Sequence, residues 1–353
     1  MWFRAFLFAG LAIACSSPKA ASDSAPGAAG NAGDGGSADG VAGAGDITSC
    51  APPRATCDAC SQGCDAEGCH AGECVVQELF NPSSPDNVVD FTVAGDALIW
   101  TNASGDVLRS GLLGEMPTTV APATGDRTLG LAADSSNVYW LGRMKGEVIQ
   151  ADAKGEGSTV LATLAGQPFD LAIADDKLLY VALADVGEIW SVARADGESV
   201  KVATPGPGAL HVAADAEYLV WSNDDAGEIA ALNRATGKVS VVASNQKHPT
   251  SVVLRDDTVY WANTGDSSMG VVSKRLPDGT TTTLALIEGA ESLALGKDYC
   301  YFAAGPAAYR APLATGPLQS IVSGYERLGT LVTTEHWLYF SDFYRGTIGR
   351  VAQ

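Results

Sequence analysis

From residue 87 onward, the chain repeats one pattern of apolar and polar positions about every forty residues. Each repeat contains a short apolar run that ends in an aromatic residue, and the seven aromatics are Trp100, Trp140, Tyr180, Trp221, Trp261, Tyr301 and Tyr339. Successive aromatics are 40, 40, 41, 40, 40 and 38 residues apart. A fixed period of this length is typical of repeat architectures in which every unit folds in the same way.

Every repeat predicts four short strands, which we call a, b, c and d. Strand a is an apolar run such as 129–133, strand b carries the aromatic, strand c follows a glycine such as Gly146, and strand d is a β-rich run such as 158–164. Turns of Gly, Asp and Asn separate the strands, and no helical period competes past residue 75. Four antiparallel strands at this period predict a blade of a β-propeller, so seven repeats predict an all-β, seven-bladed ring.

The two ends of the chain complete the count of strands. The seventh repeat stops at Gln353 after its strand c, and one unassigned strand, residues 75–80, stands upstream of the first repeat. We expect this strand to serve as strand d of the last blade, because that pairing closes the ring without an unpaired edge. The propeller is therefore expected to span residues 75–353.

The sequence around strand b resembles known propeller repeats. The segments 100–102, 221–223, 261–263 and 340–342 read WTN, WSN, WAN and FSD, and residues 87–353 are similar to the YWTD-type and NHL-type families. Only TVYWAN at 258–263 comes close to the full pattern, and seven repeats differ from the six that are usual for YWTD domains. The resemblance implies the propeller fold and a tendency to bind proteins or glycans on one face, and it transfers no catalytic residue.

Residues 1–14 read as an export signal, in which Arg4 precedes a ten-residue apolar run too short to span a bilayer. The run ends in Ala12-Ile13-Ala14 before Cys15 and resembles the lipobox of bacterial lipoproteins, although Ala12 stands where that family usually has Leu. In that family the cysteine carries several acyl chains, which implies a stable membrane anchor at Cys15. Export without a lipid is the alternative.

The residue after the cysteine, Ser16, resembles the outer-membrane version of the lipoprotein signal. We therefore expect the protein at the outer membrane or the cell surface. Residues 15–49 consist mostly of Ala, Gly, Ser and Asp and contain no aromatic residue. Such a segment cannot bury enough apolar surface to offset its chain entropy, so it is expected to be a flexible linker behind the anchor.

Six cysteines fall within residues 50–74, namely Cys50, Cys57, Cys60, Cys64, Cys69 and Cys74. Because an exported chain meets an oxidising compartment, this cysteine-rich module is expected to hold three disulfides, with fifteen pairings open. A metal site is the alternative, since Cys57 and Cys60 form a CxxC pair and His70 follows Cys69, but we expect no metal. Cys300 lies in an apolar strand, where a buried and unreactive thiol is expected.

The charge balance narrows the function classes. The chain has 22 Lys and Arg against 41 Asp and Glu, a net charge of −19, which argues against nucleic-acid binding and against a polybasic membrane-surface protein. No P-loop, GxGxxG, HExxH or GxSxG pattern occurs, so no cofactor is expected. We expect a monomer that meets the membrane through its lipid anchor alone and has a protein or glycan partner.

Two repeating sets of residues are expected to be structural. The strand-b aromatics occupy the same place in every blade, so they should pack in the core rather than stack on a carbohydrate. An Asp recurs between strands a and b, where it caps a turn by bonding its own backbone. These residues are Asp134, Asp175, Asp215, Asp256 and Asp298, which stand one per blade and too far apart to share a calcium ion.

In a propeller, the d-to-a and b-to-c connections gather on one face at the end of the central channel, which we call the channel mouth. On the d-to-a side the candidate binding residues are Arg127, Asp170, His211, Glu291 and Arg327. The b-to-c side adds Asp106, Arg143, Lys145, Asp224, Asp225, Asp266 and Arg345. These mixed charges predict either a polar binding site or an ordinary solvated rim.

We favour a noncatalytic binding or scaffold role at the bacterial cell envelope, with the ligand or partner at one face of the ring. No nucleophile–base or metal constellation can be assembled from the sequence, and no catalytic residue is assigned. The alternative is a hydrolase or lyase in which His211, with Asp170 or Glu291, supplies an acid and a base at the channel mouth. A structural surface protein without a discrete ligand is the third possibility.

Overall fold

The computed structural model describes residues 69–70, 73–74, 76–80, 87–123, 125–154, 157–175, 177–265, 270–275 and 279–353. The export signal, Cys15, the linker and the cysteines at 50, 57, 60 and 64 lie outside the described residues. Of the cysteine-rich module, the structure describes β1 (Cys69–His70) and β2 (Glu73–Cys74), which pair antiparallel with Cys69 opposite Cys74. No described helix is long and apolar enough to cross a membrane.

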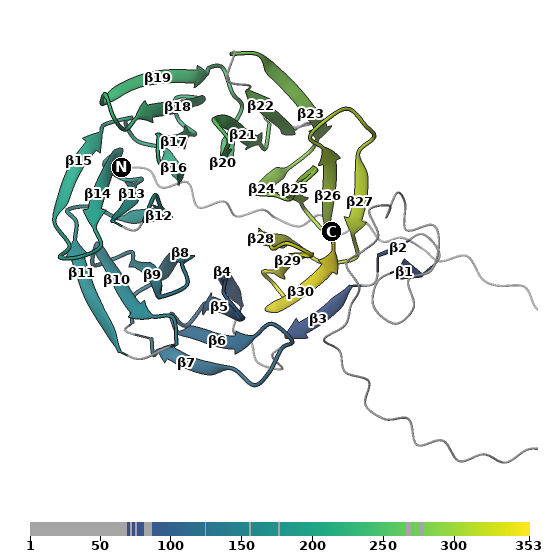
Figure 1. Cartoon of the computed structure of the whole chain (residues 1–353), viewed down its shortest axis with the longest axis horizontal. Helices are drawn as coiled ribbons and strands as arrows, with labels where there is room; N and C mark the ends of the chain where they lie inside the picture. The colour runs from purple at the N-terminus through teal and green to yellow at the C-terminus, as the bar shows by residue number, and fades with distance from the viewer. Residues whose placement is uncertain are drawn as a thin grey trace, which may run out of the picture. The chain divides into compact units, whose positions relative to one another are not determined.

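Seven four-stranded antiparallel sheets are arranged around a central axis (Figure 1), so the predicted all-β, seven-bladed propeller is confirmed. Within the first six blades the strand order follows the chain, from strand a nearest the axis to strand d at the rim. The blades are consecutive in sequence because each is a meander whose turns are only a few residues long.

The strands of blades 1 to 3 have these bounds. Blade 1 holds β4 (Val88–Ala94), β5 (Ala97–Asn102), β6 (Val107–Gly111) and β7 (Thr118–Ala121). Blade 2 holds β8 (Thr128–Ala133), β9 (Asn137–Gly142), β10 (Glu147–Asp152) and β11 (Ser158–Thr163). Blade 3 holds β12 (Pro168–Ile173), β13 (Leu178–Leu183), β14 (Glu188–Ala193) and β15 (Ser199–Ala203).

Blades 4 to 7 follow the same plan. Blade 4 holds β16 (Ala209–Ala214), β17 (Tyr218–Asn223), β18 (Glu228–Asn233) and β19 (Lys238–Ala243). Blade 5 holds β20 (Pro249–Arg255), β21 (Thr258–Asn263), β22 (Gly270–Arg275) and β23 (Thr281–Ile287). Blade 6 holds β24 (Ala290–Leu295), β25 (Tyr299–Ala304), β26 (Ala307–Pro312) and β27 (Gln319–Val322), and blade 7 begins with β28 (Leu328–Thr333), β29 (Trp337–Asp342) and β30 (Thr347–Ala352).

The last blade takes its outer strand from the other end of the propeller. β3 (Gln77–Phe80) pairs antiparallel with β30, with Gln77 opposite Arg350 and Glu78 opposite Gly349. The side chains reinforce this pairing, since Arg350 Nε donates to Gln77 Oε1 at 2.8 Å. The closure expected from the strand count is therefore present, and it joins residues about 270 positions apart in sequence.

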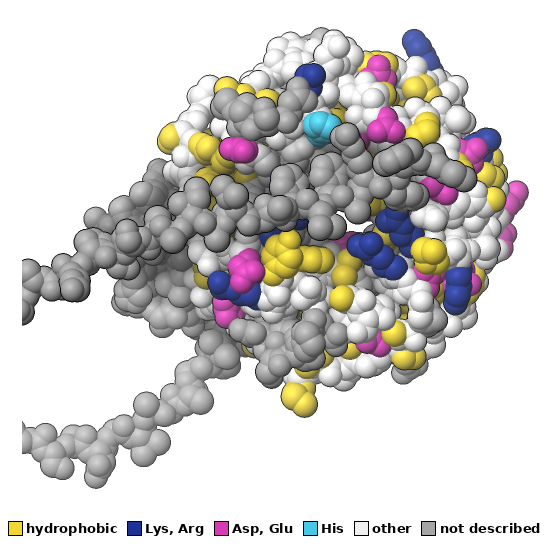
Figure 2. Space-filling model, turned by 180° about the vertical axis from the view of Figure 1, so that it is seen from behind, with side chains coloured by type: hydrophobic (Ala, Val, Ile, Leu, Met, Phe, Trp, Pro, Cys, Tyr) yellow, Lys and Arg dark blue, Asp and Glu magenta, His cyan; other side chains and the backbone are white. Residues whose placement is uncertain are grey.

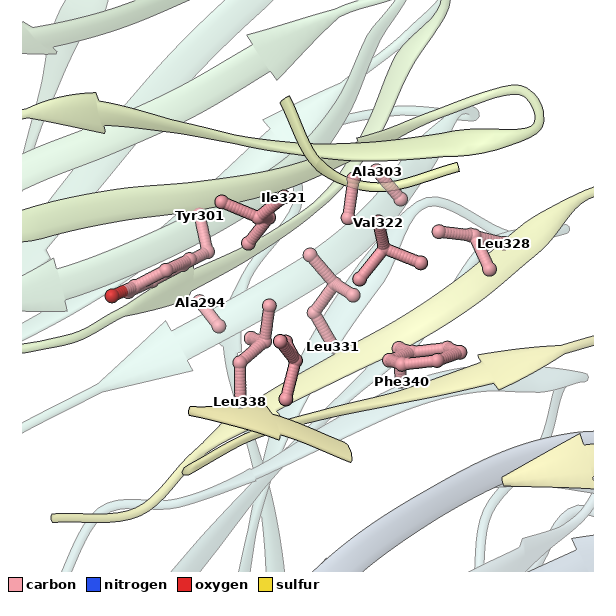
Figure 3. Packing of buried hydrophobic residues seen from close by; sticks show 11 residues of the cluster. Ala294, Tyr301, Ala303, Ile321, Val322, Leu328, Leu331, Leu338 and Phe340 are labelled. Carbon is pink, nitrogen blue, oxygen red and sulfur yellow. The ribbon is translucent and has the colours of Figure 1, made fainter. Parts of the chain in front are cut away.

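The strand-b aromatics form the core, as expected. All seven are at least 96% buried, and the b strands are the most deeply buried strands of their blades. Apolar clusters fill the spaces between neighbouring sheets. In Figure 3, Val322 of blade 6 lies opposite Leu331 and Phe340 of blade 7. Each blade is thus stabilised mainly by packing against its two neighbours.

Arginine side chains link neighbouring blades at the end of the ring opposite the channel mouth. Arg194 of blade 3 binds Tyr139 Oη at 2.8 Å and the carboxylate of Asp134, both in blade 2. Arg234 repeats this arrangement one blade further on with Tyr180 Oη (3.0 Å) and Asp175 Oδ2 (2.6 Å). The Asp therefore bonds both its own turn and the next blade.

The turn role expected for the recurring Asp holds in the clearest cases. Asp134 Oδ1 accepts from Ser136 N and Asn137 N at 2.7 and 2.8 Å, and Asp175 and Asp215 accept from the equivalent amides of their own turns. Asp256 differs because it adopts a positive φ of 49° itself. Asp298 contributes its backbone carbonyl, which accepts from Leu313 N at 2.9 Å.

Cys300 is a free, fully buried thiol in strand b of blade 6. Burial among apolar groups raises the pKa of Cys300 to about 12, because the thiolate would lose its hydration. The burial of Cys300 expected from the sequence is confirmed, and the raised pKa fits the expected unreactive thiol.

We expect Trp261→Ala to lower the free energy of unfolding by about 3–5 kcal/mol, because truncating a buried aromatic leaves a cavity. Trp261 is 1% exposed, and its Nε1 also donates to Gln246 Oε1 at 2.8 Å. The measurement is urea denaturation followed by circular dichroism. Met116→Ala is the matched control, because Met116 is 90% exposed and should change the same quantity by less than about 0.5 kcal/mol. Equal stability of the Trp261 variant and the wild type would contradict this core assignment.

Candidate functional site

The innermost strands place one residue per blade at the same position around the axis. In each blade, the pairing of strands a and b shifts register near the channel mouth, and this position lies at or next to that bulge. Bulges of this kind redirect side chains and often stand beside functional sites. We call these residues the inner ring: Asp90, Gly130, Asp170, His211, Ser251, Ser292 and Thr330.

Members of the inner ring hydrogen-bond the innermost strand of the following blade. Asp90 Oδ2 accepts from Leu131 N at 3.0 Å, Asp170 Oδ2 from Val212 N at 3.0 Å, and Ser292 Oγ from Leu331 N at 3.2 Å. Strand a has a free edge toward the axis, so its amides need partners other than a fifth strand. The polar side chains of the inner ring supply such partners.

Asp90 connects three blades. Besides Leu131 of blade 2, its carboxylate accepts from Phe91 N (2.9 Å) in its own blade and from Thr330 Oγ1 (2.8 Å) in blade 7. Burial raises the pKa of Asp90 to about 6, and the negative charge of Asp170 adds to this, while the three hydrogen bonds oppose it.

Gly130 stands between these two carboxylates in the order of blades. Its φ is +49°, and an added Cβ would come within 3.2 Å of Asp170 Cα and 2.9 Å of a Leu141 methyl group. No side chain therefore separates Asp90 from Asp170 at this point of the ring, which is why their charges interact.

Asp170 and His211 form the first of two pairs among the candidate residues. His211 Nδ1 lies 3.3 Å from Asp170 Oδ2, and both side chains are partly exposed. The His211 ring also packs against Phe169 in a T-shaped arrangement, with centroids 5.5 Å apart. Asp170 already accepts from Leu171 N and Val212 N, so its carboxylate is held in place by the backbone.

Glu291 and Arg327 form the second pair. Arg327 Nη2 donates to both carboxylate oxygens of Glu291 at 2.9 and 2.7 Å. These hydrogen bonds hold the pKa of Arg327 above its usual range. Glu291 is the extra residue at the bulge of blade 6, which explains how it reaches the d-to-a connection of blade 7.

The five candidates predicted on the d-to-a side thus form two separate pairs, with Arg127 standing apart. Arg127 is exposed, and its side chain has no hydrogen bond or ion pair with another residue in the described ranges. The backbone carbonyl of Arg127 accepts a hydrogen bond from Arg143 N at 3.1 Å, so the main chains of the two arginines lie side by side.

The b-to-c side also divides into structural and exposed groups. Asp106 accepts from Asn102 Nδ2 and Ala123 N, and Asp224 Oδ1 lies 2.9 Å from His248 Nδ1. Arg143 lies with its guanidinium 5.8 Å from the centre of the Phe169 ring. Asp266 lies outside the described residues.

Two carboxylates at the channel mouth were missed by the sequence analysis. Asp126 accepts from Arg127 N, Met144 N and Lys145 N, and so shapes the turn that carries the basic residues. Asp342 is fully buried and accepts from Glu326 N and Tyr344 N at 3.1 and 3.0 Å. Asp126 lies in a connection whose sequence differs between repeats. Asp342 is the last residue of β29, at the position that Asn102, Asn223 and Asn263 occupy in other repeats.

Neither of two described cavities is lined by His211. One of about 430 Å³ lies between blades 2 and 3 beside Tyr139, Lys177 and Arg194. The other, of about 100 Å³, is lined by residues that include Asp126, Trp140 and Glu147. Among the residues with described structure, no group of three or more His, Cys, Asp or Glu side chains could hold a metal ion.

Comparison with known proteins shows the fold. No family model matches the chain, and no curated protein matches its sequence. Among solved structures, virginiamycin B lyase from Staphylococcus aureus aligns with a TM-score of 0.68 at 12% identity, covering 79% of this chain and 99% of that one. A streptogramin B lyase structure gives 0.66 at 14% identity, with 78% of this chain and 97% of that chain covered.

Hydrazine synthase from Kuenenia stuttgartiensis also aligns with a TM-score of 0.66, at 15% identity over 78% of this chain and 97% of that chain. The lyases and hydrazine synthase carry unrelated activities on similar propellers, and all are below 16% identity to this chain. The likeness therefore establishes the propeller and no shared activity.

We expect Asp90→Asn to change how stability depends on pH. Because the folded pKa of Asp90 is about 6, above the usual 3.8, its protonated form stabilises the fold below about pH 4, and this contribution is lost as the pH rises through about 6. The variant lacks this titration, so its melting temperature relative to wild type should rise between pH 4 and pH 8. Asp96→Asn is the control, since Asp96 has an almost fully exposed side chain. A constant difference between the Asp90 variant and wild type across this range would contradict the assignment.

Proposed function

We propose that this protein is a noncatalytic binding or scaffold lipoprotein of the bacterial cell envelope, and that its ligand or partner meets the channel mouth. The observation that carries the proposal is the state of the two carboxylates that an acid–base role would need. The Asp170 carboxylate accepts hydrogen bonds from two backbone amides and lies next to His211. Both carboxylate oxygens of Glu291 accept hydrogen bonds from Arg327. A carboxylate fixed in this way supports the loops around it and is poorly placed to exchange protons with a substrate.

The exposed groups at the channel mouth suit binding better. Tyr344 and Met144 are 54% and 69% exposed on the b-to-c turns of blades 7 and 2. Arg127 and Lys145 are exposed beside Met144's turn. Amphipathic and apolar side chains flanked by charged residues are typical of surfaces that recognise proteins or glycans.

The test is a screen of the full chain carrying Cys15→Ser, on an array of bacterial glycans and envelope peptides. We expect at least one specific ligand, whose binding falls about tenfold or more in Arg127→Ala, which removes an exposed cation from the mouth. Lys238→Ala on the outer strand β19 is the matched control and should bind as the unsubstituted chain does. The proposal fails if no class of ligand binds, or if binding is insensitive to every substitution at the channel mouth.

An enzymatic role is the second candidate, and the Asp170–His211 pair at 3.3 Å favours it. Such a pair can orient an imidazole for general acid–base catalysis. One of the similar structures, a catalytically inactive virginiamycin B lyase, contains quinupristin, which offers a concrete probe. If this chain converts quinupristin on incubation into a product with a different chromatographic retention time and His211→Ala abolishes that conversion, the noncatalytic proposal is wrong.

The lipoprotein part of the proposal rests on the sequence around Cys15, which lies outside the described residues. In the native host, we expect a clickable palmitate analogue to label the full chain and the chain to fractionate with membranes. Cys15→Ala should lose the label, while Cys300→Ala, a matched change at a buried thiol, should keep it. Labelling that survives Cys15→Ala would contradict an anchor at this cysteine.

A further inference from the structure

We propose that the part of the channel mouth formed by blades 2 and 3 is a subsite for an acidic sugar, bound through its carboxylate and its ring. This inference rests on the proposed binding function and adds the chemical class of the ligand. We call the residues concerned the basic sector: Arg127, Arg143, Lys145 and Phe169.

The basic sector has the opposite sign to the chain as a whole. The net charge is −19, yet three cations stand within nineteen residues of one another on two connections of blade 2. Figure 2 shows Lys and Arg side chains gathered beside the centre of one face of the ring. A local concentration of positive charge on an acidic protein attracts anions and orients them on approach.

The neighbouring carboxylates bond to backbone amides rather than to these cations. Asp126 uses its oxygens on three backbone amides, those of Arg127, Met144 and Lys145. Asp185 is exposed, and its Oδ1 accepts from Gln167 N at 2.8 Å. Among the described residues, neither Arg127 nor Lys145 forms an ion pair with any carboxylate.

Arg143 and Phe169 supply the shape of the subsite. The Arg143 guanidinium lies 5.8 Å from the centre of the Phe169 ring, and its Nε makes a long hydrogen bond of 3.4 Å to Gln167 Oε1. Its two terminal nitrogens have no hydrogen-bond acceptor among the residues whose structure is described, and they form the fork that binds a carboxylate in bidentate fashion. Phe169 is the extra residue at the bulge of blade 3, so its ring is turned out of the sheet pairing.

An aromatic face next to an arginine fork matches the two sides of a uronic acid. One face of the sugar ring presents apolar C–H groups, and the carboxylate projects from the edge of the ring. His211 packs against Phe169 in a T-shaped arrangement, with ring centroids 5.5 Å apart, and limits how far the Phe169 ring can turn. An inorganic anion would use only the cations, and a neutral sugar would use only the ring.

In the opposite part of the channel mouth, cationic side chains are paired with carboxylates. Arg327 is paired with both oxygens of Glu291, and His248 is paired with Asp224. Asp225 adds an exposed acid in blade 4. An anionic ligand should therefore bind to blades 2 and 3 rather than to the whole rim.

The experiment is isothermal titration of the full chain carrying Cys15→Ser with an oligogalacturonate, with a neutral galactan oligomer and inorganic phosphate as comparison probes. We expect the oligogalacturonate to bind more tightly than either, with affinity that falls as NaCl is raised from 50 to 500 mM. Arg143→Gln and Phe169→Leu should each weaken binding about tenfold, which is the loss of one charged hydrogen bond or one ring contact. Lys238→Gln, an exposed cation on the outer strand β19, should bind as the unsubstituted chain does.

Thermal melts establish that the variants are folded, and Arg143→Lys separates fork geometry from charge. Lysine keeps the charge without the fork, so it should restore less than half of the lost affinity. Equal affinity for galactan and oligogalacturonate, or equal binding by Arg143→Gln, would overturn the acidic-sugar subsite and leave the binding function intact. The binding function itself fails only in the array screen, so the two failures are distinguishable.

Discussion

The pairing of β3 with β30 is the constraint on which the rest of this structure depends. It makes a linear series of hairpin-connected sheets into a closed ring, because the two ends of the propeller share one sheet. Without it, blade 7 would have three strands and a free outer edge. The chain segment that leads into blade 1 would then no longer be part of the sheet of blade 7. Arg350 strengthens the joint, since it bonds Gln77 and also stacks over Trp337 with its guanidinium 4.1 Å from the ring centre.

Closure also decides what can exist at the channel mouth. Once the innermost strands surround an axis, each has an edge that no further strand can cover, and the inner ring of side chains takes over the hydrogen bonding there. Asp90 joins blades 7, 1 and 2 in this way. The carboxylate whose pKa is raised to about 6 therefore lies where blade 7 meets blade 1. Structure and candidate function therefore share the same few residues.

Much of the fold could be predicted from the sequence, because the same residue types recur at the same position of each blade. Trp100, Trp140 and Trp261 mark strand b directly, and the last strand could be placed by counting. The candidate site was harder to predict, because the inner-ring position is occupied by Asp, Gly, His, Ser or Thr in different blades and no residue type recurs in all of them. Contacts such as Arg143 over Phe169 or Arg194 on Asp134 join neighbouring blades, and their formation depends on bulges and sheet twist that the sequence does not display.

The most direct test of this account is hydrogen–deuterium exchange of the full chain, read on peptides that cover residues 77–80 and 347–352. The closed ring predicts that the amides of β30 exchange as slowly as those of the c strands in blades 2 to 4, and that Gln77→Pro in β3 speeds exchange in β30 before any other strand c. Rapid exchange across β30 in the unsubstituted chain would show an open last blade and would contradict the account.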